Sequence, residues 1–527
     1  MTKLKNLLVD ATAPIFLGSS VLFFNPSEFF LANWDEYPYM YSDLVVSFLF
    51  ISSIVTILLF LILLITKRLN AKVHEKLQSL VLVSAVIFWL QGAIGDFTSI
   101  VDGKLFATGS AVSGVINVIL WFGAIIMALI YSRFFQKNGV KIGVIIVLTQ
   151  IVFFTGAVLN APAAPSFKHY YINRENKFTY SAKDNVIVLL VDTFQSDLFN
   201  ELLETHPDFM DKFSGFTYYP DTVGGFPTTY PSIPLLLTGK YYDNTQPIQT
   251  FIEKAYTSSG SAFVQYRALG YETYAGCNFM IYCDTALESN VIYREQKIGG
   301  LNFLSQTLKI IKTGALKNIP HIIQAKIKGG TSLTANPDSV FLKQMEMTSK
   351  VVDKLDGTFK FFYLAGAHPP FKYDENLEPK EATLDISGFK AQAMGELKII
   401  FAFLEIMDKL NIYDNTRVII AADHGTGILP DPTNKVRNAA IPLVLVKEKY
   451  KRGKMAISPI KITLAGVSKF INGGLMQEFE TRPFYYYSWD DGWNKAFLPP
   501  MTEYIVKGNS WDVKSYEKTG KLLSPKI

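Results

Sequence analysis

Residues 185–193 read NVIVLLVDT, and residues 418–425 read VIIAADHG. Each stretch is a run of β-branched and apolar residues that ends in a carboxylate, Asp192 in the first and Asp423 in the second. Such runs are typical of buried strands in a parallel sheet, and ligands of open α/β sheets bind beyond the carboxyl ends of the strands. We therefore expect Asp192, Asp423 and His424 to converge at one edge of a sheet.

Two carboxylates and an imidazole are suitable ligands for a divalent cation. We expect one ion, zinc or manganese, with calcium or magnesium as the alternatives. An Asp after a strand can also be only a helix cap or a turn residue, so the metal hypothesis depends on the two motifs meeting. A second, histidine-rich site is not expected. The other histidines considered are His74, assigned to a cytoplasmic loop, and three that follow no convincing strand: His169, His206 and His321.

Residues 224–239, GGFPTTYPSIPLLLTG, supply a candidate nucleophile. The glycines and prolines predict a tight loop, and residues 232–237 are typical of the start of a helix. A hydroxyl at a helix N-terminus faces backbone N–H groups and the positive end of the helix dipole, which suits a phosphate or sulfate group. Thr229 is the candidate, with Thr228 as its competitor. The structural alternative for Thr229 is a helix cap.

In their order along the chain, these motifs resemble the alkaline phosphatase and sulfatase superfamily over residues 185–450. The branch that they resemble is the membrane-anchored one, with the lipoteichoic acid synthases and phosphoethanolamine transferases. The transferase pattern Thr-x-x-Ser-x-Pro is matched by Thr229, Ser232 and Pro234. In that branch a carboxylate after the first strand, the Thr nucleophile and a later Asp-His pair hold the metal. The resemblance therefore implies Thr229 as the catalytic nucleophile and the following metal ligands: Asp192, Thr229, Asp423 and His424.

A third match is the stretch at residues 361–371, FFYLAGAHPPF, which resembles the family strand whose terminal His contacts phosphate or sulfate oxygens of the substrate. The resemblance implies that His368 binds substrate, and an ordinary loop histidine is the alternative. Sulfatases carry Cys/Ser-x-Pro-x-Arg. This chain keeps Pro231 but has Thr229 at the Cys/Ser position and Ile233 at the Arg position. Because formylglycine forms from Cys or Ser, these two residues count against sulfatase chemistry.

The first 160 residues predict a bundle of about five transmembrane helices. Of the 527 residues only 18% are charged, and the apolar excess is concentrated before residue 160. Five stretches are near the roughly 20 residues that a span needs. They are 7–24, which is the weakest because it contains Asp10 and Pro14, and then 44–66, 77–95, 113–132 and 140–160. An uncleaved signal-like segment or an interfacial helix is the alternative for the first stretch.

The distribution of basic residues predicts the orientation of this bundle. Lysines and arginines precede the first stretch and occupy the loops after the second and fourth, whereas the other loops are mainly acidic. This asymmetry indicates a cytoplasmic N-terminus in a bacterial cytoplasmic (inner) membrane. After five crossings the rest of the chain lies outside. The net charge of +5 therefore does not indicate nucleic-acid binding.

The remaining chain predicts an α/β domain with a mainly parallel sheet flanked by helices, because strand-like and helical runs alternate from residue 185. The expected division is a transmembrane helical domain at 1–160, a linker at 161–184, a sulfatase-like catalytic domain at 185–480 and a β-rich C-terminal appendage at 481–527. The only cysteines, Cys277 and Cys283, lie in the part assigned outside, where a disulfide would persist. Two free thiols are the alternative.

These inferences indicate a membrane-bound, metal-dependent phosphoryl-group transferase that acts outside the cytoplasm through Thr229. The resemblance implies a membrane phospholipid as donor and a surface glycan, or water, as acceptor, and no nucleic-acid partner is expected. Two alternatives stay open: a sulfatase-like hydrolase of phosphodiesters or sulfate esters, and a non-catalytic lipid-binding sensor on the same fold. Three polar residues after the second motif either bind a substrate phosphate or form a solvated loop: Asn434, Lys435 and Arg437.

Overall fold

The computed structural model describes residues 2–32, 41–94, 111–159, 170–172, 176–275, 286–289, 291–293, 301–316, 318–320, 336–488 and 496–526. Backbone contacts divide the chain into two units. Unit 1 contains Met1–His169 and Glu295–Ser332, and unit 2 contains Tyr170–Arg294 and Leu333–Ile527. The chain therefore passes from one unit to the other three times.

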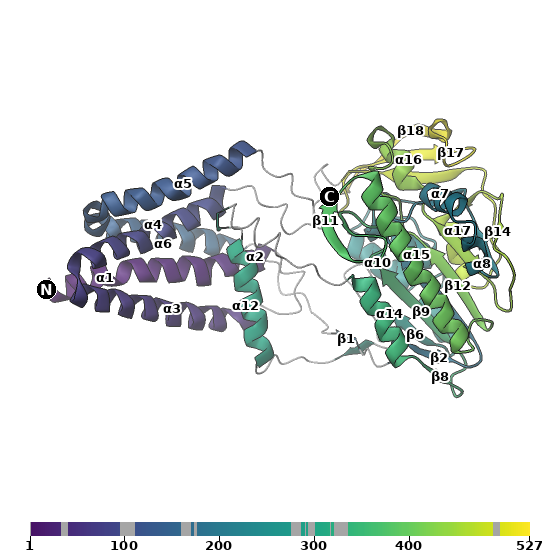
Figure 1. Ribbon diagram of the computed structural model, residues 1–527, viewed down its shortest axis with the longest axis horizontal. Coiled ribbons are helices and arrows are strands. Elements are labelled where there is room, and N and C mark those ends of the chain that lie inside the picture. The colour runs from purple at the N-terminus through teal and green to yellow at the C-terminus, as the bar shows by residue number, and fades with distance from the viewer. Residues whose placement is uncertain are drawn as a thin grey trace. The chain divides into compact units, whose positions relative to one another are not determined.

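Unit 1 is a bundle of helices (Figure 1). Its helices are α1 (Thr2–Ser19), a π-helical turn (Ser20–Phe24), α2 (Asn25–Ala32), α3 (Tyr41–Leu69), α4 (Ala71–Ile94), α5 (Ala111–Ile130), α6 (Ser132–Leu159) and α12 (Leu301–Leu316). Among the described residues four helices are long and apolar enough to cross a membrane: Val9–Ala32, Tyr41–Leu69, Ala71–Gln91 and Ser132–Leu159. The fifth expected stretch, 113–132, lies in α5, of which residues Asn117–Ile130 are found as a shorter apolar helix.

Two partner side chains explain how the first candidate span tolerates the buried Asp10. Oδ2 of Asp10 lies 2.5 Å from Nζ of Lys67, and Oδ1 lies 3.2 Å from Nε2 of His74. His74 is 2% exposed and belongs to the first turn of α4, so its assignment to a cytoplasmic loop was wrong. A charge inside a helical bundle is stable only when it is paired, and helices α3 and α4 supply these partners.

Residues 295–332 are part of unit 1, although the sequence placed them within the catalytic domain at 185–480. Ile310 and Ile311 of α12 pack in one apolar cluster with Phe29 and Phe30 of α2. Burial of these side chains keeps α12 on the bundle. The boundaries of the catalytic domain thus have to be redrawn around an inserted segment.

Unit 2 is built on a seven-stranded sheet in the order β14-β4-β13-β12-β3-β9-β6. Strands β12, β3, β9 and β6 are parallel to one another, whereas β13 is antiparallel to both β12 and β4. This confirms the predicted α/β fold with a mainly parallel sheet. The strands are β3 (Asn185–Val191), β4 (Phe216–Tyr218), β6 (Glu272–Ala275), β9 (Thr358–Leu364), β12 (Thr416–Ala421), β13 (Val444–Lys447) and β14 (Ala456–Ile457).

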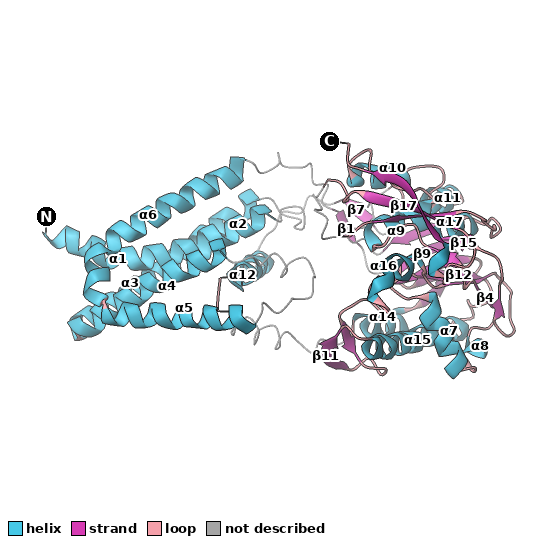
Figure 2. Cartoon of the chain, turned by 90° about the horizontal axis from the view of Figure 1, so that it is seen from above, coloured by secondary structure: helices cyan, strands magenta, loops and turns pink. Residues whose placement is uncertain are grey.

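Helices cover both faces of this sheet (Figure 2). Successive residues of β3 point to opposite faces, so Ile187 and Leu189 belong to one apolar cluster and Val186 and Val188 to the other. The first face is covered mainly by α7 (Ser196–Thr205), α14 (Pro337–Thr348) and α15 (Ile386–Lys409). The second is covered by α9 (Thr229–Thr238), α10 (Ile248–Tyr256), α11 (Ala262–Ala268) and α17 (Leu464–Ile471).

Short elements complete unit 2. They are β1 (Tyr170–Ile172), β2 (Thr179–Ser181), α8 (Phe209–Lys212), β5 (Thr222–Val223), β7 (Val291–Tyr293), β8 (Lys350–Val352), β10 (Phe371–Tyr373), β11 (Pro379–Thr383), η4 (Pro432–Asn434), α16 (Lys435–Ala440), β15 (Ile462–Thr463) and η6 (Val513–Ser515). The range 161–184, expected to be a linker, contains β2, which pairs with β8. The last residues form an antiparallel sheet of β16 (Arg482–Tyr486), β17 (Met501–Val506) and β18 (Tyr516–Leu523).

Candidate active site and metal centre

Asp192, Asp423 and His424 meet at the carboxyl edge of the central sheet. Strands β3 and β12 are parallel neighbours, with Leu190 opposite Ala421, so the two strands end side by side. Asp192 directly follows β3, and Asp423 is the second residue after β12. The three side chains come from residues that are 1%, 0% and 7% exposed. The two motifs therefore form one buried cluster.

The donor atoms of this cluster fit a divalent cation. One ligand atom from each residue lies within 4.8 Å of the other two, and Nε2 of His424 is 3.3 Å from Oδ2 of Asp423. That oxygen is buried and accepts no hydrogen bond from any described residue. Burial, reinforced by the negative charge of Asp192, raises the pKa of Asp423 to about 6. Two buried carboxylates with oxygens within 4.8 Å of each other are stable as anions only with a cation between them. Their oxygens and the imidazole nitrogen form a donor set that suits zinc or manganese.

The hydrogen bonding of His424 leaves its Nε2 atom available to a metal. Nδ1 lies 2.7 Å from the carbonyl oxygen of Gly425, which can only accept, so Nδ1 carries the proton. In the neutral imidazole Nε2 is then the nitrogen without a proton, and it faces the carboxylates, as in metal sites whose other imidazole nitrogen is fixed by a carbonyl. A side chain at Gly425 would come within 2.0 Å of the Asn438 carbonyl oxygen, which explains why a glycine follows the histidine.

Two further residues hold the candidate metal ligands in place, and the sequence analysis missed both. The N–H of Thr193 donates to Oδ1 of Asp423 at 3.1 Å, and its hydroxyl donates to Oδ1 of Asp192 at 2.5 Å. Thr193 has a φ of 62°, a strained conformation that persists because these bonds fix it. On the neighbouring strand, Tyr363 donates its hydroxyl proton to Oδ2 of Asp192. Burial raises the pKa of Tyr363 above its ordinary value, so the phenol remains a donor.

Helix α9 presents Thr229 to the cluster. Its hydroxyl oxygen lies 3.2 Å from Nε2 of His424, whereas the hydroxyl of Thr228 is hydrogen-bonded to Tyr487. The helix begins at Thr229, three residues before the expected start. The sequence did not predict this first turn because it contains Pro231, and proline usually ends a helix. In the first turn, however, a backbone N–H has no partner within the helix, so proline is tolerated there. The two threonines therefore have different environments, and only Thr229 contacts a candidate metal ligand.

The loop that carries His368 packs against the backbone of Asp192. The N–H of Ala367 donates to the carbonyl oxygen of Asp192 at 2.9 Å, and Nε2 of Gln392 donates to the carbonyl oxygen of His368 at 3.1 Å. Gly366, with a φ of 57°, lies so close that a Cβ there would be 2.6 Å from the same Asp192 oxygen. The backbone of this loop is thus fixed. The His368 side chain is exposed, and no described residue is hydrogen-bonded to its imidazole.

A buried pair of acids supports the same loop. Asp338 is 3% exposed and accepts the backbone N–H groups of Ala365 and Gly366 at 3.0 and 2.9 Å. Burial, and then the charge of Asp338, raise the pKa of Glu396 well above its ordinary value. The raised pKa favours the protonated form of Glu396 beside an Asp338 that accepts hydrogen bonds. Neither residue stood out in the sequence, because the pair forms only where α14 packs on α15.

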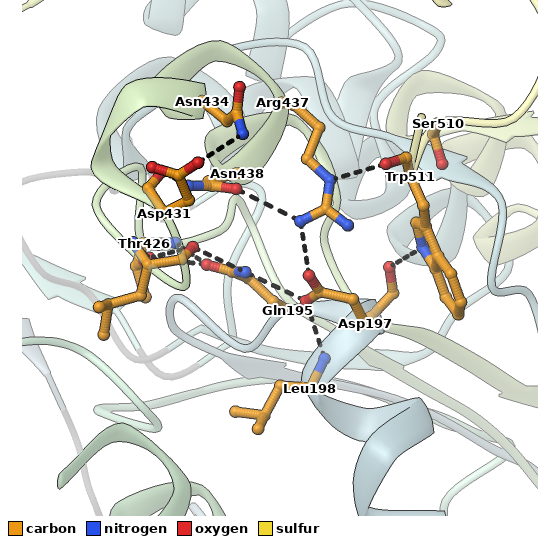
Figure 3. A network of polar contacts seen from close by, with 12 residues as sticks. Gln195, Asp197, Leu198, Thr426, Asp431, Asn434, Arg437, Asn438, Ser510 and Trp511 are labelled. Atoms are coloured by element: carbon orange, nitrogen blue, oxygen red, sulfur yellow. Dashed lines mark hydrogen bonds and ion pairs between the residues drawn. The ribbon is translucent and has the colours of Figure 1, made fainter. Parts of the chain in front are cut away.

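Arg437 is occupied by contacts within the protein. Figure 3 shows its guanidinium directed at Asp197, with Nη1 2.6 Å from Oδ2, and at the Trp511 carbonyl oxygen, which Nε reaches at 3.1 Å. Asn434 is hydrogen-bonded to Asp431 at 3.0 Å. These bonds favour the structural alternative for this segment over substrate binding, because Arg437 joins the C-terminal sheet region to α7.

Cys277 and Cys283 lie outside the described residues, as do His169 and His321. The disulfide between the two cysteines stays a prediction.

Comparison with known proteins identifies a family for this part of the chain. A family model described as Sulfatase matches residues 184–454. No curated protein sequence matches the chain. Among solved structures, the chain is similar to phosphonate monoester hydrolase SpPMH from Silicibacter pomeroyi, with 12% identity, a TM-score of 0.35 and coverage of 63% of this chain and 88% of that chain.

Two further solved structures are similar to this chain at a comparable level. The C-terminal periplasmic domain of EcEptC from Escherichia coli, in complex with zinc, has 11% identity and a TM-score of 0.34, with coverage of 69% of this chain and 98% of that chain. BT1596, a 2-O GAG sulfatase, has 10% identity and a TM-score of 0.37, with coverage of 62% and 81%.

Proposed function

Because the chain belongs to the sulfatase family and is a sulfatase-like enzyme, we propose that it is a membrane-bound, metal-dependent phosphoryl-group transferase whose nucleophile is Thr229. The observation that carries this proposal is the position of Thr229 at the N-terminus of α9, with its hydroxyl 3.2 Å from Nε2 of His424. A nucleophile at this point meets both the metal ligands and the N–H groups of the helix start.

The proposed metal ligands are Asp192, Thr229, Asp423 and His424. A divalent cation bound by these residues would supply positive charge that favours the ionised Thr229 hydroxyl and an anionic phosphodiester. Tyr363 and Thr193 keep Asp192 in place through their hydroxyl groups.

The proposed reaction has two steps that both occur at phosphorus. The Thr229 hydroxyl loses its proton, its oxygen bonds to the phosphorus of a phosphodiester, and the bond from phosphorus to the leaving alcohol breaks as that alcohol takes up a proton. The acceptor hydroxyl then attacks phosphorus from the opposite side, loses its proton and displaces Thr229, which regains one. His368, exposed on its fixed loop, binds the phosphoryl oxygens or protonates the leaving alcohol.

We propose a membrane phospholipid as the donor and a surface glycan as the acceptor. The four candidate spans support a lipid donor, because they keep the enzyme at a membrane. The alternation of basic and acidic loops supports an active site outside the cytoplasm. Thr229 supports phosphoryl rather than sulfate transfer, because a threonine cannot become formylglycine.

The full-length protein in lipid nanodiscs tests this function. Nanodiscs contain phosphatidylglycerol or phosphatidylethanolamine with Zn²⁺ or Mn²⁺, and the product measured is diacylglycerol, by mass spectrometry. We expect release from one of these lipids, and its loss in Thr229→Ala. Free headgroup phosphate with no product on an added oligosaccharide would identify a hydrolase. Cleavage of a sulfate ester without any diacylglycerol would contradict the proposal, and lipid binding without turnover would indicate a sensor.

A further inference from the structure

Helix α12 lies at one end of the unit 1 bundle and runs crosswise to the long helices (Figures 1 and 2). Its buried face includes Ile310, Ile311 and Gly314. The two isoleucines share a cluster with Phe29 of α2, and Gly314 lies against the same helix. Helix α2 is the last part of the candidate span Val9–Ala32. Helix α12 therefore packs where this candidate span ends.

Hydrogen bonds fix the residues that follow α12 to the same end of the bundle. Nδ2 of Asn318 donates to the carbonyl oxygen of Phe88 at 3.1 Å, and Nε2 of Gln91 donates to the carbonyl oxygen of Ile319 at 2.5 Å. Phe88 and Gln91 belong to the last turns of α4. The segment is thus held by two different spans, which makes its position a property of the bundle.

The face of α12 that points away from the bundle is both apolar and cationic. Leu304 and Leu308 are 45% and 48% exposed, and Lys309 and Lys312 are also exposed. Helical spacing puts the two leucines on a flank next to the buried face and the two lysines farther out. Within the described part of the chain neither lysine is paired with a carboxylate. This distribution is that of a helix that lies in a membrane interface.

The charge of the inserted segment supports the same conclusion. Residues 295–332 contain six lysines and one glutamate, with no arginine or aspartate, which gives a net charge of +5, equal to that of the whole chain. Positive charge in short loops between spans is explained by the orientation of the bundle. That explanation does not apply here, because the segment is inserted within the α/β unit and is more than 100 residues from the last span in sequence.

We propose that α12 binds anionic phospholipids at the membrane surface beside the bundle, with Leu304 and Leu308 in the boundary of the acyl chains and Lys309 and Lys312 on the phosphates. Clusters of lysine on an amphipathic helix are attracted to anionic lipids, and this attraction is weakened by salt. The chain enters this segment from unit 2 and returns to unit 2 after it. This inference does not depend on the proposed reaction.

Hydrogen–deuterium exchange of the full-length protein in nanodiscs tests this proposal. Exchange is measured for peptides from residues 301–316, in nanodiscs of phosphatidylcholine alone and of phosphatidylcholine with phosphatidylglycerol, at low and high salt. The variant is Lys309→Gln with Lys312→Gln, which keeps side-chain length and helix propensity. The matched control is Lys451→Gln with Lys454→Gln, two exposed lysines of unit 2.

We expect phosphatidylglycerol to slow exchange in α12 of the wild type and of the control pair, and high salt to reduce this protection. The lipid-dependent difference should be lost in the Lys309/Lys312 pair. Equal exchange in both lipids would overturn the proposal. So would protection that survives in the Lys309/Lys312 pair, or that is lost equally in the control pair.

Discussion

The Thr229 hydroxyl oxygen lies 3.2 Å from Nε2 of His424, although the two residues are 195 positions apart in the chain. Nε2 is the nitrogen that the bond from Nδ1 to Gly425 leaves unprotonated. The hydroxyl of Thr229, the candidate nucleophile, therefore contacts the Nε2 lone pair of His424, which faces Asp192 and Asp423. This contact joins a helix start on one face of the sheet to the carboxyl end of β12, and it is the geometric basis of the proposed reaction.

The two adjacent threonines should differ sharply when they are replaced. Thr229→Ala removes the covalent route, so diacylglycerol release should fall by at least about 10³-fold, whereas Thr229→Ser keeps the hydroxyl and should retain measurable activity. Thr228→Val, which loses only the hydrogen bond to Tyr487, is the control and should stay within about tenfold of the wild type. An inactive Thr228→Val beside an active Thr229→Ala would show that the other threonine is the nucleophile.

Bound metal should depend on Asp423. Asp423→Ala removes one ligand and leaves Asp192 as an unpaired buried carboxylate, so both metal content and activity should be lost. The metal content of the purified protein is measured by inductively coupled plasma mass spectrometry. The control is Asp208→Asn, an exposed aspartate at the start of α8, which should keep full occupancy. Full occupancy in Asp423→Ala would remove this residue from the site.

Metal affinity should fall at acid pH. Because the pKa of Asp423 is raised to about 6, a proton competes with the metal below that pH, and affinity should fall about tenfold per pH unit for one displaced proton. The folding stability of the metal-free protein should instead increase at acid pH. The folded pKa exceeds the unfolded value of about 3.9, so the folded state binds more protons between these values. Its stability should therefore rise as pH falls from 7 towards 4.

Thermal unfolding of metal-free and metal-loaded protein at pH 5, 6 and 7 measures both effects. Asp423→Asn has no proton to gain at this position, so its metal-free form should lack the acid stabilisation. A metal-free wild type whose melting temperature follows that of Asp423→Asn across this range would contradict the assignment of the titration to Asp423.

The meeting of Asp192, Asp423 and His424 could be predicted from the sequence because each of them follows an apolar strand. Asp192 and Asp423 each come after a run of apolar residues that predicts a buried strand. Parallel strands have their carboxyl ends at the same edge of a sheet, so the two aspartates were expected to meet there. Tyr363 could not be assigned in this way, because its bond to Asp192 depends on the register of β9 against β3. Asp338 was missed for a similar reason, since it acts only where α14 packs against the loop after β9.

The errors in the predicted organisation also have physical causes. Residues 295–332 have no pattern of their own that assigns them to the bundle, and their position is decided by packing of Ile310 and Ile311 on α2. His74 lies among basic residues of the kind found in loops between spans. Its contact with Asp10 instead stabilises a position in the first turn of α4. In both cases a contact between distant segments decided the outcome.

Arg437 should be important for stability rather than for catalysis. Arg437→Gln breaks the ion pair with Asp197 and the bond to the Trp511 carbonyl, and should lower the free energy of unfolding by about 2 kcal/mol. Urea unfolding measures this change. The double variant with Asp197→Asn should lose less than the sum of the single losses, because both replacements break the same ion pair. A raised KM for the lipid at unchanged stability would instead identify Arg437 as a substrate contact.

The orientation of the spans predicts that residues 161–527 lie outside the cytoplasm. Alkaline phosphatase fused after residue 165 should be active in a bacterial host, and a reporter that works only in the cytoplasm should be inactive at the same point. A catalytic domain that stays protected from protease in intact spheroplasts would contradict this orientation.

Mass spectrometry of Thr229 during turnover tests the central claim most directly. The full-length protein in nanodiscs, with Zn²⁺ and the phospholipid from which it releases diacylglycerol, is quenched in acid before an acceptor is added, and its peptides are sequenced. We expect the headgroup phosphate of that lipid on Thr229, and its disappearance after the acceptor is supplied. Release of diacylglycerol with Thr229 unmodified at every quench time, or with the phosphate on another residue, would contradict the account.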